Sequence, residues 1–295
     1  MSEDEVAKHT RGLVETLEGL GCLRSAWIRE ALLKVPRHLF IEWWPVEGRP
    51  EFTPVDPQNL SEEQLSRIYS DEAILIRFLP HTSSSSQPQI VVNMLEDLQA
   101  QRGNKVLEIG AGTGWNAGLL ACGVGDDRLV YSVDLQADLH EQAGEHLRTA
   151  GFPNVNLRTG DGGYGWPEAA PFDRIIVTCG PPDIPPAWIE QLAEGGILLV
   201  PLRTLGWNPL IRLRRHGDCV AGEFTRSTGF MPIEGDFSSD REHLTFRPRS
   251  DPRIEELLKR EASRAALAEA LPCEWLDLWE CKFFLRLELG GLGVF

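Results

Sequence analysis

The sequence predicts an α/β protein with a mostly parallel sheet and helices on both faces. Three observations support this prediction. Between residues 89 and 201, short apolar runs of strand length alternate with segments of helical periodicity, which is typical of βαβ units. The first third of the chain shows helical periodicity only. The hydrophobic share of 42% and the charged share of 25% are those of a globular protein.

The N-terminal region, residues 1–80, is expected to be a helical segment that packs on the core. Helices are expected at 6–20, at 26–34 and from 61 onward, with a loop at 43–57. Apolar residues at helical spacing define the first helix, which Gly21 ends. Ser61 and Gln64 form an S-x-x-Q capping pattern at the start of the third.

The central region, residues 81–236, is expected to hold the sheet. Strands are expected at 105–109, 129–133, 155–158, 174–177 and 196–201, and helices at 90–98, 115–122, 138–150 and 186–193. Two further β-like segments follow, at 210–214 and 219–224. Because right-handed crossovers bring the carboxyl ends of parallel strands to one edge, a ligand site is expected at that edge.

A C-terminal extension, residues 237–295, is expected to follow the central region. It is predicted to contain a charged helix at 251–270 and an aromatic-rich end at 275–295. So many aromatic side chains are expected to be packed against other apolar groups.

The charge balance excludes several function classes. The chain carries 29 Lys and Arg against 44 Asp and Glu, a formal net charge of −15. This balance argues against a nucleic-acid partner, which needs a basic surface, and against an anionic membrane. The 6 cysteines form no C-x-x-C pair, the 7 histidines show no metal-ligand spacing, and no secretory signal is visible. We therefore expect a cytoplasmic protein without a metal site.

The segment from Glu108 to Trp115 carries the chemistry. A predicted strand ends in Glu108, and Gly110, Gly112 and Gly114 follow before a predicted helix. Glycines let a ligand approach the backbone closely, and the helix start offers free N–H donors. The spacing differs from the G-x-G-x-x-G of dinucleotide sites. It resembles motif I of class I S-adenosylmethionine-dependent methyltransferases, which have a Rossmann-like fold.

That resemblance implies two further cofactor positions. Asp134 ends the next predicted strand, where the fold binds the ribose hydroxyls, and Asp161 with Gly162 follows the strand after that, facing the adenine. An acid at one strand end is more often a cap or a solvated residue. Three acids in order at successive strand ends favour a binding site. The implied cofactor is S-adenosyl-L-methionine, with S-adenosyl-L-homocysteine as its product.

A second set of segments resembles the protein-L-isoaspartate O-methyltransferase family. The most specific are S-S-S-S-Q-P at 83–88, similar to the family's T-x-S-(Q/A)-P, and V-P-R-H-L-F at 35–40, similar to its V-P-R-x-x-F. The others are 69–76, 160–162, 194–201 and 230–233. The resemblance covers residues 25 to 235.

Carried over by position, the resemblance assigns two catalytic residues. Ser86 matches the family's active-site serine, and Ser84 matches its preceding threonine. Gln89 and Ser83 depart from the usual residues, and the C-terminal extension exceeds the compact members of the family, which leaves the acceptor open. A flexible polar linker is the alternative interpretation of the serine run.

The implied reaction is methyl esterification of an isoaspartyl or aspartyl carboxylate in a protein or peptide, followed by succinimide formation. Ser86 would hold the carboxylate through its hydroxyl or its N–H, with support from Ser84. Gly180-Pro181-Pro182-Asp183 occupies the place of an amine-methylation motif but lacks its polar and aromatic residues, so it predicts a turn. Two alternatives stay open: tailoring of an Asp in a ribosomally made peptide, and a non-catalytic cofactor-binding scaffold.

Overall fold

The computed structural model describes residues 2–46, 51–77, 82–204, 208–217 and 219–238. The chain divides into two units after Ser238, so the described residues all belong to the first unit. The helix predicted at 251–270 and the aromatic-rich end at 275–295 lie outside the described residues. The predicted boundaries at 80/81 and 236/237 stay predictions.

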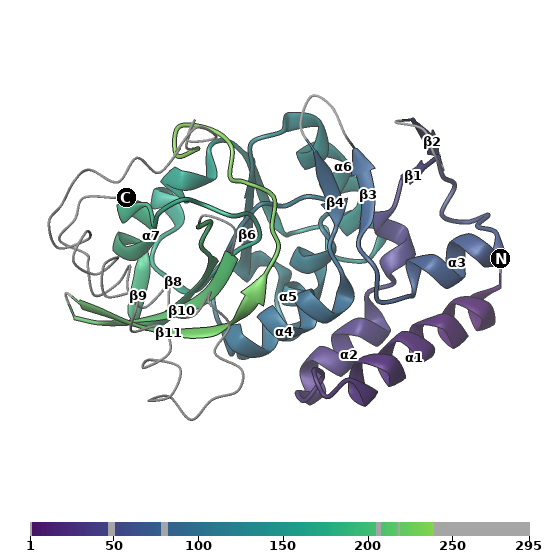
Figure 1. Cartoon of the computed structure of the whole chain (residues 1–295), viewed down its shortest axis with the longest axis horizontal. Helices are drawn as coiled ribbons and strands as arrows, with labels where there is room; N and C mark the ends of the chain where they lie inside the picture. The colour runs from purple at the N-terminus through teal and green to yellow at the C-terminus, as the bar shows by residue number, and fades with distance from the viewer. Residues whose placement is uncertain (1, 47–50, 78–81, 205–207, 218, 239–295) are drawn as a thin grey trace, which may run out of the picture. The chain divides into compact units, whose positions relative to one another are not determined.

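A seven-stranded sheet forms the centre of the first unit, in the order β11-β10-β9-β8-β5-β6-β7 (Figure 1). Its strands are β5 (Val106–Ile109), β6 (Val130–Asp134), β7 (Asn156–Thr159), β8 (Phe172–Val177), β9 (Leu192–Pro201), β10 (Asn208–His216) and β11 (Cys219–Thr228). The strands from β9 to β7 run parallel, and β10 and β11 add an antiparallel hairpin at one edge. The predicted mostly parallel α/β sheet is confirmed.

The helices between the strands are α4 (Pro88–Leu98), α5 (Trp115–Val124), α6 (Ala137–Thr149) and α7 (Pro186–Glu190). The helix predicted at 186–193 ends early. Leu192 is fully buried and pairs with Phe172 as the first residue of β9. Sheet pairing therefore overrides the helical pattern at this point. None of the described helices is long and apolar enough to cross a membrane.

The N-terminal region contains α1 (Glu3–Gly19), α2 (Ala26–Lys34) and α3 (Glu62–Ile68). The bounds of α2 are those predicted, and Ser61 and Gln64 form the predicted capping box. The loop predicted at 43–57 is instead partly a hairpin of two short strands, β1 (Trp43–Pro45) and β2 (Phe52–Pro54). A second antiparallel pair, β3 (Ile74–Arg77) and β4 (Ser83–Ser85), was also not predicted.

One buried apolar cluster joins the N-terminal helices to the sheet. It includes Leu17 of α1, Ile28 of α2, Leu95 of α4, Leu120 of α5 and Val106 of β5, all fully buried. Figure 1 shows α2 beside α4 and α5, with α1 packed on α2, away from the β10–β11 hairpin. The N-terminal helices thus support the helices that lead into the site.

Candidate functional site

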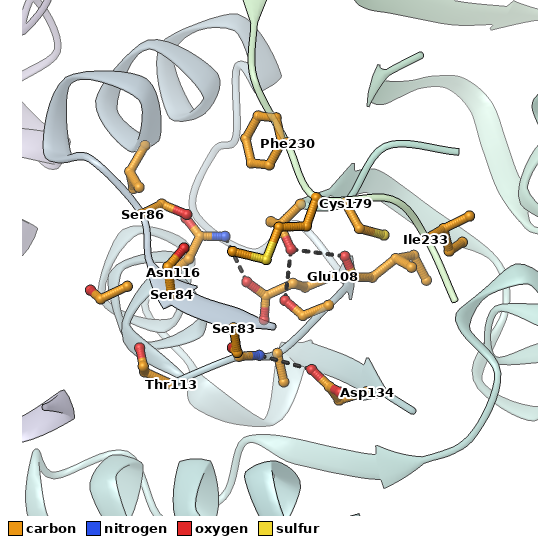
Figure 2. A pocket seen from close by; sticks show the side chains of 18 of the residues that line it. Ser83, Ser84, Ser86, Glu108, Thr113, Asn116, Asp134, Cys179, Phe230 and Ile233 are labelled. Carbon is orange, nitrogen blue, oxygen red and sulfur yellow. Dashed lines mark hydrogen bonds between the residues drawn. The ribbon is translucent and has the colours of Figure 1, made fainter. Parts of the chain in front are cut away.

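A cavity of about 580 Å³ opens at the carboxyl ends of β5, β6 and β8. The chain turns from β5 to β6 on one side and later to β8 on the other, which is where open α/β sheets bind ligands. The volume is in the range of small-molecule sites. In Figure 2, Ser84, Ser86 and Asn116 gather at one side of this cavity and Cys179 and Ile233 at the other.

The glycine loop, residues 110–114, follows β5, and its first four residues line the cavity. Gly110 has φ +98°, and a Cβ there would collide with the side chain of Thr178. Gly112 has φ +51° and lines the cavity, and no atom lies within 4 Å of where its Cβ would stand. The two positions need glycine for different reasons: close packing at Gly110, and open space for a ligand at Gly112.

Gly114 has a different surrounding from the one the resemblance implies. It is not among the residues that line the cavity, and its φ is +88°. A Cβ there would lie 3.2 Å from Cβ of Ala143 in α6. Gly114 therefore lets the start of α5 pack closely on α6, and its predicted cofactor contact stays a prediction.

Glu108 is fully buried at the end of β5 and lines the cavity. Its carboxyl accepts hydrogen bonds from Ser132 Oγ at 2.5 Å and from Asn116 Nδ2 at 2.7 Å. Burial raises the pKa of Glu108 to about 7, although both hydrogen bonds favour the charged form. The Oδ1 atom of Asn116 is buried without a hydrogen-bond partner in the described structure.

The structure separates the two predicted aspartates. Asp134 lines the cavity, accepts a hydrogen bond from the N–H of Gly112 at 2.9 Å, and has its pKa raised by burial. Asp161 does not line it, since its carboxyl accepts from the N–H groups of Gly163 and Asp236, at 2.8 and 2.6 Å. Gly162, next to Asp161, does line the cavity. The predicted adenine contact of Asp161 stays a prediction.

The serine segment, residues 83–86, also lines the cavity. Its first three residues form β4, which pairs with β3 in antiparallel register, so the segment is not a free linker. Ser84 and Ser86 are half-buried and line the cavity. Neither hydroxyl has a hydrogen-bond partner among the described residues, so both can bind a ligand.

Two polar residues that hold the serine segment were missed as site residues in the sequence. Arg37 donates a hydrogen bond to the carbonyl oxygen of Ser86 at 2.9 Å. Asp71 accepts from the N–H of Gln89 at 2.7 Å and from Nε2 of Gln87 at 2.9 Å, so it caps α4 from outside the helix. Both belong to segments that resemble the family, but nothing local in the sequence indicates what they contact.

The segment from Phe230 to Glu234 crosses the cavity on the side of β8. It is held by Gly180, whose N–H donates to the carbonyl of Met231 at 2.6 Å and whose carbonyl accepts from Ile233 at 3.0 Å. Cys179, just before Gly180, lines the cavity, and burial raises the pKa of its thiol to about 12. The thiol is therefore protonated at neutral pH.

The titratable side chains on the cavity surface are mainly acidic. Glu108, Asp134 and Glu234 line it, whereas no Lys, Arg or His is present among its described lining residues. Such a lining favours a cationic ligand. In the described parts of the chain, no group of three or more His, Cys, Asp or Glu side chains could hold a metal ion.

Comparisons with known proteins agree with this geometry. The family model described as protein-L-isoaspartate(D-aspartate) O-methyltransferase matches residues 49–237. The protein-L-isoaspartate O-methyltransferase of Dictyoglomus thermophilum is 37% identical over 227 residues, which cover 77% of this chain and 91% of that protein. The protein of the same name from Methanopyrus kandleri is 35% identical over 244 residues, covering 79% of this chain and 98% of that protein.

Two solved structures are similar to the chain. A protein-L-isoaspartate O-methyltransferase superposes with a TM-score of 0.66 at 30% identity, covering 78% of this chain and 67% of that one. A putative protein-L-isoaspartate O-methyltransferase from Plasmodium falciparum, in complex with S-adenosyl-L-homocysteine, superposes with a TM-score of 0.60. The second is 16% identical, covers 77% of this chain and 98% of that one, and bears on the fold alone.

Proposed function

The chain belongs to the protein-L-isoaspartate(D-aspartate) O-methyltransferase family, and on this premise we propose that it esterifies the free carboxylate of isoaspartyl residues in proteins. Members of this family are S-adenosylmethionine-dependent enzymes. One observation supports the proposal most: the glycine loop and two serine hydroxyls that have no hydrogen-bond partner among the described residues line the same cavity. A methyl donor held by the loop and a carboxylate held by the serines would then meet within it.

The cavity fits the cofactor. Gly112 leaves open space where a side chain would stand, and Asn116 presents a buried Oδ1 without a partner. Asp134 lines the same space, and the acidic lining suits a cation. Gly110, Gly112, Asp134 and Glu108 would hold the cofactor, which supplies a methyl group on a positively charged sulfur.

The acceptor carboxylate needs positioning rather than activation. A carboxylate is ionised at neutral pH, so no general base is required. The hydroxyls of Ser86 and Ser84 would donate hydrogen bonds to it and aim one oxygen toward the glycine loop. Attraction between opposite charges weakens as the methyl group moves, so the residues contribute mainly through orientation.

The methyl ester would then close to a succinimide. In that step a backbone nitrogen of the acceptor attacks the ester carbonyl, loses its proton and expels methanol. All bonds that change belong to the acceptor, so no side chain of this chain has to take part. The enzyme's contribution ends with release of the ester.

A second candidate is tailoring of a specific Asp in a ribosomally made peptide. One observation favours it: residues 238–295 continue beyond the segment that matches the family model. Those residues could provide recognition of a dedicated peptide. The two candidates share the cofactor and the chemistry, and they differ in the acceptor.

Methyl transfer from labelled S-adenosylmethionine to paired peptides separates these functions. The peptides should be identical except for Asp or isoAsp at one position. Labelling of the isoAsp peptide alone supports the proposed function. Calorimetry with the cofactor supplies the control. If the cofactor binds but neither peptide is methylated, the proposed esterification of isoaspartyl residues is rejected in favour of a dedicated peptide acceptor. Absence of cofactor binding would reject both enzymatic candidates.

A further inference from the structure

Arg37 lies behind the serine segment, outside the cavity itself. It begins a short 3-10 helix, Arg37–Phe40, and is 1% exposed. It is the arginine of V-P-R-H-L-F, a segment that the proposed chemistry leaves without a role. Among the described residues its guanidinium forms no ion pair, although the charges of Asp71 and Glu72 favour its protonated form. Burial of a charge is costly unless hydrogen bonds compensate.

The guanidinium of Arg37 is held by backbone carbonyls. Nη1 donates to the carbonyl of Ile68 at 2.7 Å and to that of Ser70 at 3.2 Å. Nη2 donates at 2.9 Å to the carbonyls of both Glu72 and Ser86. One planar group thus ties the chain after α3 to the last residue of the serine segment.

The same guanidinium also lies close to the residue that follows the glycine loop. Its central carbon lies 5.2 Å from the ring centroid of Trp115, the first residue of α5 after the glycine loop. Trp115 is itself anchored, because its Nε1 donates to the carbonyl of Val35 at 3.3 Å. Arg37 therefore has a fixed neighbour on the cofactor side while it holds Ser86.

Arg37 keeps its charge in this setting. Burial lowers the pKa of its guanidinium to about 10, which still leaves it protonated at neutral pH. Its loss would leave the carbonyls of Ile68, Glu72 and Ser86 without this donor, and unsatisfied carbonyls in a buried position favour local rearrangement. The pairing of β4 with β3 ends at Ser85, so it does not hold the carbonyl of Ser86 in place of Arg37.

We propose that Arg37 is a positioning residue for the acceptor: by holding the carbonyl of Ser86, it fixes the serine hydroxyls in the cavity that the glycine loop also lines. The proposal rests on the proposed function for its kinetic consequences only. The glycine loop has anchors of its own, since Gly110 N–H donates to Val133 at 2.8 Å and Gly112 N–H to Asp134 at 2.9 Å. Loss of Arg37 should therefore affect the acceptor and spare the cofactor.

The test compares Arg37→Met with a matched control, Arg215→Met. Arg215 also donates to backbone carbonyls, those of Ile189, Glu190 and Leu192 at 3.1, 3.3 and 2.6 Å. It does not line the cavity. The control therefore removes a similar clamp far from the serine segment.

Three kinds of measurement are made on the full chain below its unfolding temperature. The first is the kinetics of methyl transfer to an isoAsp peptide, kcat and KM; the second is the calorimetric Kd for S-adenosylmethionine. The third is hydrogen exchange of the backbone amides between residues 82 and 89, where Pro88 has none. For Arg37→Met we expect a loss of roughly 100-fold in kcat/KM, a cofactor Kd within about threefold of wild type, and faster exchange at 82–89. For Arg215→Met we expect none of these changes. Arg37→Lys keeps the charge and part of the donor set, and should recover part of the loss.

Two results would overturn the proposal. One is an Arg37→Met protein with kcat/KM and exchange close to wild type. The other is a parallel loss of cofactor affinity and acceptor kinetics, which would indicate a general structural role. If Arg37→Met does not fold, Arg37→Lys is judged by the same criteria. Exchange at 82–89 needs no acceptor, so it tests Arg37 even if the wild-type protein fails to methylate isoAsp and the proposed function is wrong.

Discussion

The two sides of the cavity are built differently. The proposed cofactor side centres on one continuous strand–loop–helix unit, from Glu108 to Asn116, whose geometry depends on backbone conformation at glycines. The proposed acceptor side is the serine segment, which Arg37 holds at Ser86, while Asp71 holds the residues that follow it, Gln87 and Gln89. The first is specified locally, and the second depends on contacts between residues far apart in sequence.

This difference predicts how each side responds to substitution. A local unit bound into the parallel sheet should resist the loss of any single side chain but tolerate no change in its backbone. When one of its anchoring residues is replaced, a segment held by a few long-range hydrogen bonds should stay folded, but its side chains should no longer be held in one position. Effects on the cofactor side should therefore appear as changes in stability or cofactor affinity, and effects on the acceptor side as changes in kinetics.

The largest effect is expected from Gly110→Ala, compared with Gly112→Ala. At Gly110 the φ of +98° and the collision with Thr178 act together, and we expect a loss of about 3 kcal/mol in the free energy of unfolding. At Gly112 the Cβ would enter open space, so the loss should be about 1 kcal/mol, with a larger effect on cofactor affinity. Thermal unfolding measures the loss of stability in each variant, and calorimetry measures its affinity for the cofactor. Equal losses of stability would contradict the different roles of these glycines.

The sequence predicted the strand–loop–helix unit around the glycine loop because its signals are local. Gly110, Gly112 and Glu108 stand next to one another in the sequence, and α2 was predicted at its observed bounds for the same reason. It did not predict β4, because serine has no strong preference for strands and the pairing depends on β3. It also gave no sign that the carboxyl of Asp161 bonds to the N–H of Asp236, 75 residues away.

Glu108 is expected to make the free energy of unfolding depend on pH, by an amount similar to the loss in Gly110→Ala. Burial raises its pKa in the folded protein to about 7, against an ordinary value of 4.5. The folded state binds this proton more tightly, so the stabilisation is present below pH 4.5 and is lost as pH rises through 7. The loss is about 3 kcal/mol. Glu108→Gln resembles the protonated acid and should remove this part of the pH dependence.

Thermal unfolding of both proteins between pH 4.5 and 8 measures the effect of Glu108. Asp134, whose pKa burial also raises, is present in both proteins, so the difference between the two curves reports Glu108. Parallel curves would show that Glu108 titrates near its ordinary pKa. The cofactor side would then be less sensitive to pH than its burial implies.

Ser86→Ala is expected to have a smaller effect, which should appear only in the kinetics of methyl transfer. Loss of one hydrogen-bond donor to the acceptor should lower turnover roughly 10- to 100-fold without a change in cofactor affinity or stability. Ser84→Ala should show the same pattern with a smaller loss, since Ser84 only supports the bound group. Methyl transfer to an isoAsp peptide and calorimetry are the measurements. A matching loss of cofactor affinity in Ser86→Ala would contradict its assignment to the acceptor.

The smallest effect is expected from Asp71→Ala, compared with Ser61→Ala. Both residues cap helices: Asp71 accepts from Gln89 at the start of α4, and Ser61 accepts from Gln64 at the start of α3. Each substitution should cost about 1 kcal/mol of stability. Because α4 directly follows the serine segment, Asp71→Ala should also raise KM for the acceptor about threefold, while Ser61→Ala leaves it unchanged. If neither variant changes KM, the start of α4 stays in place without this outside cap, and long-range support of the acceptor side would rest on Arg37 rather than on both residues.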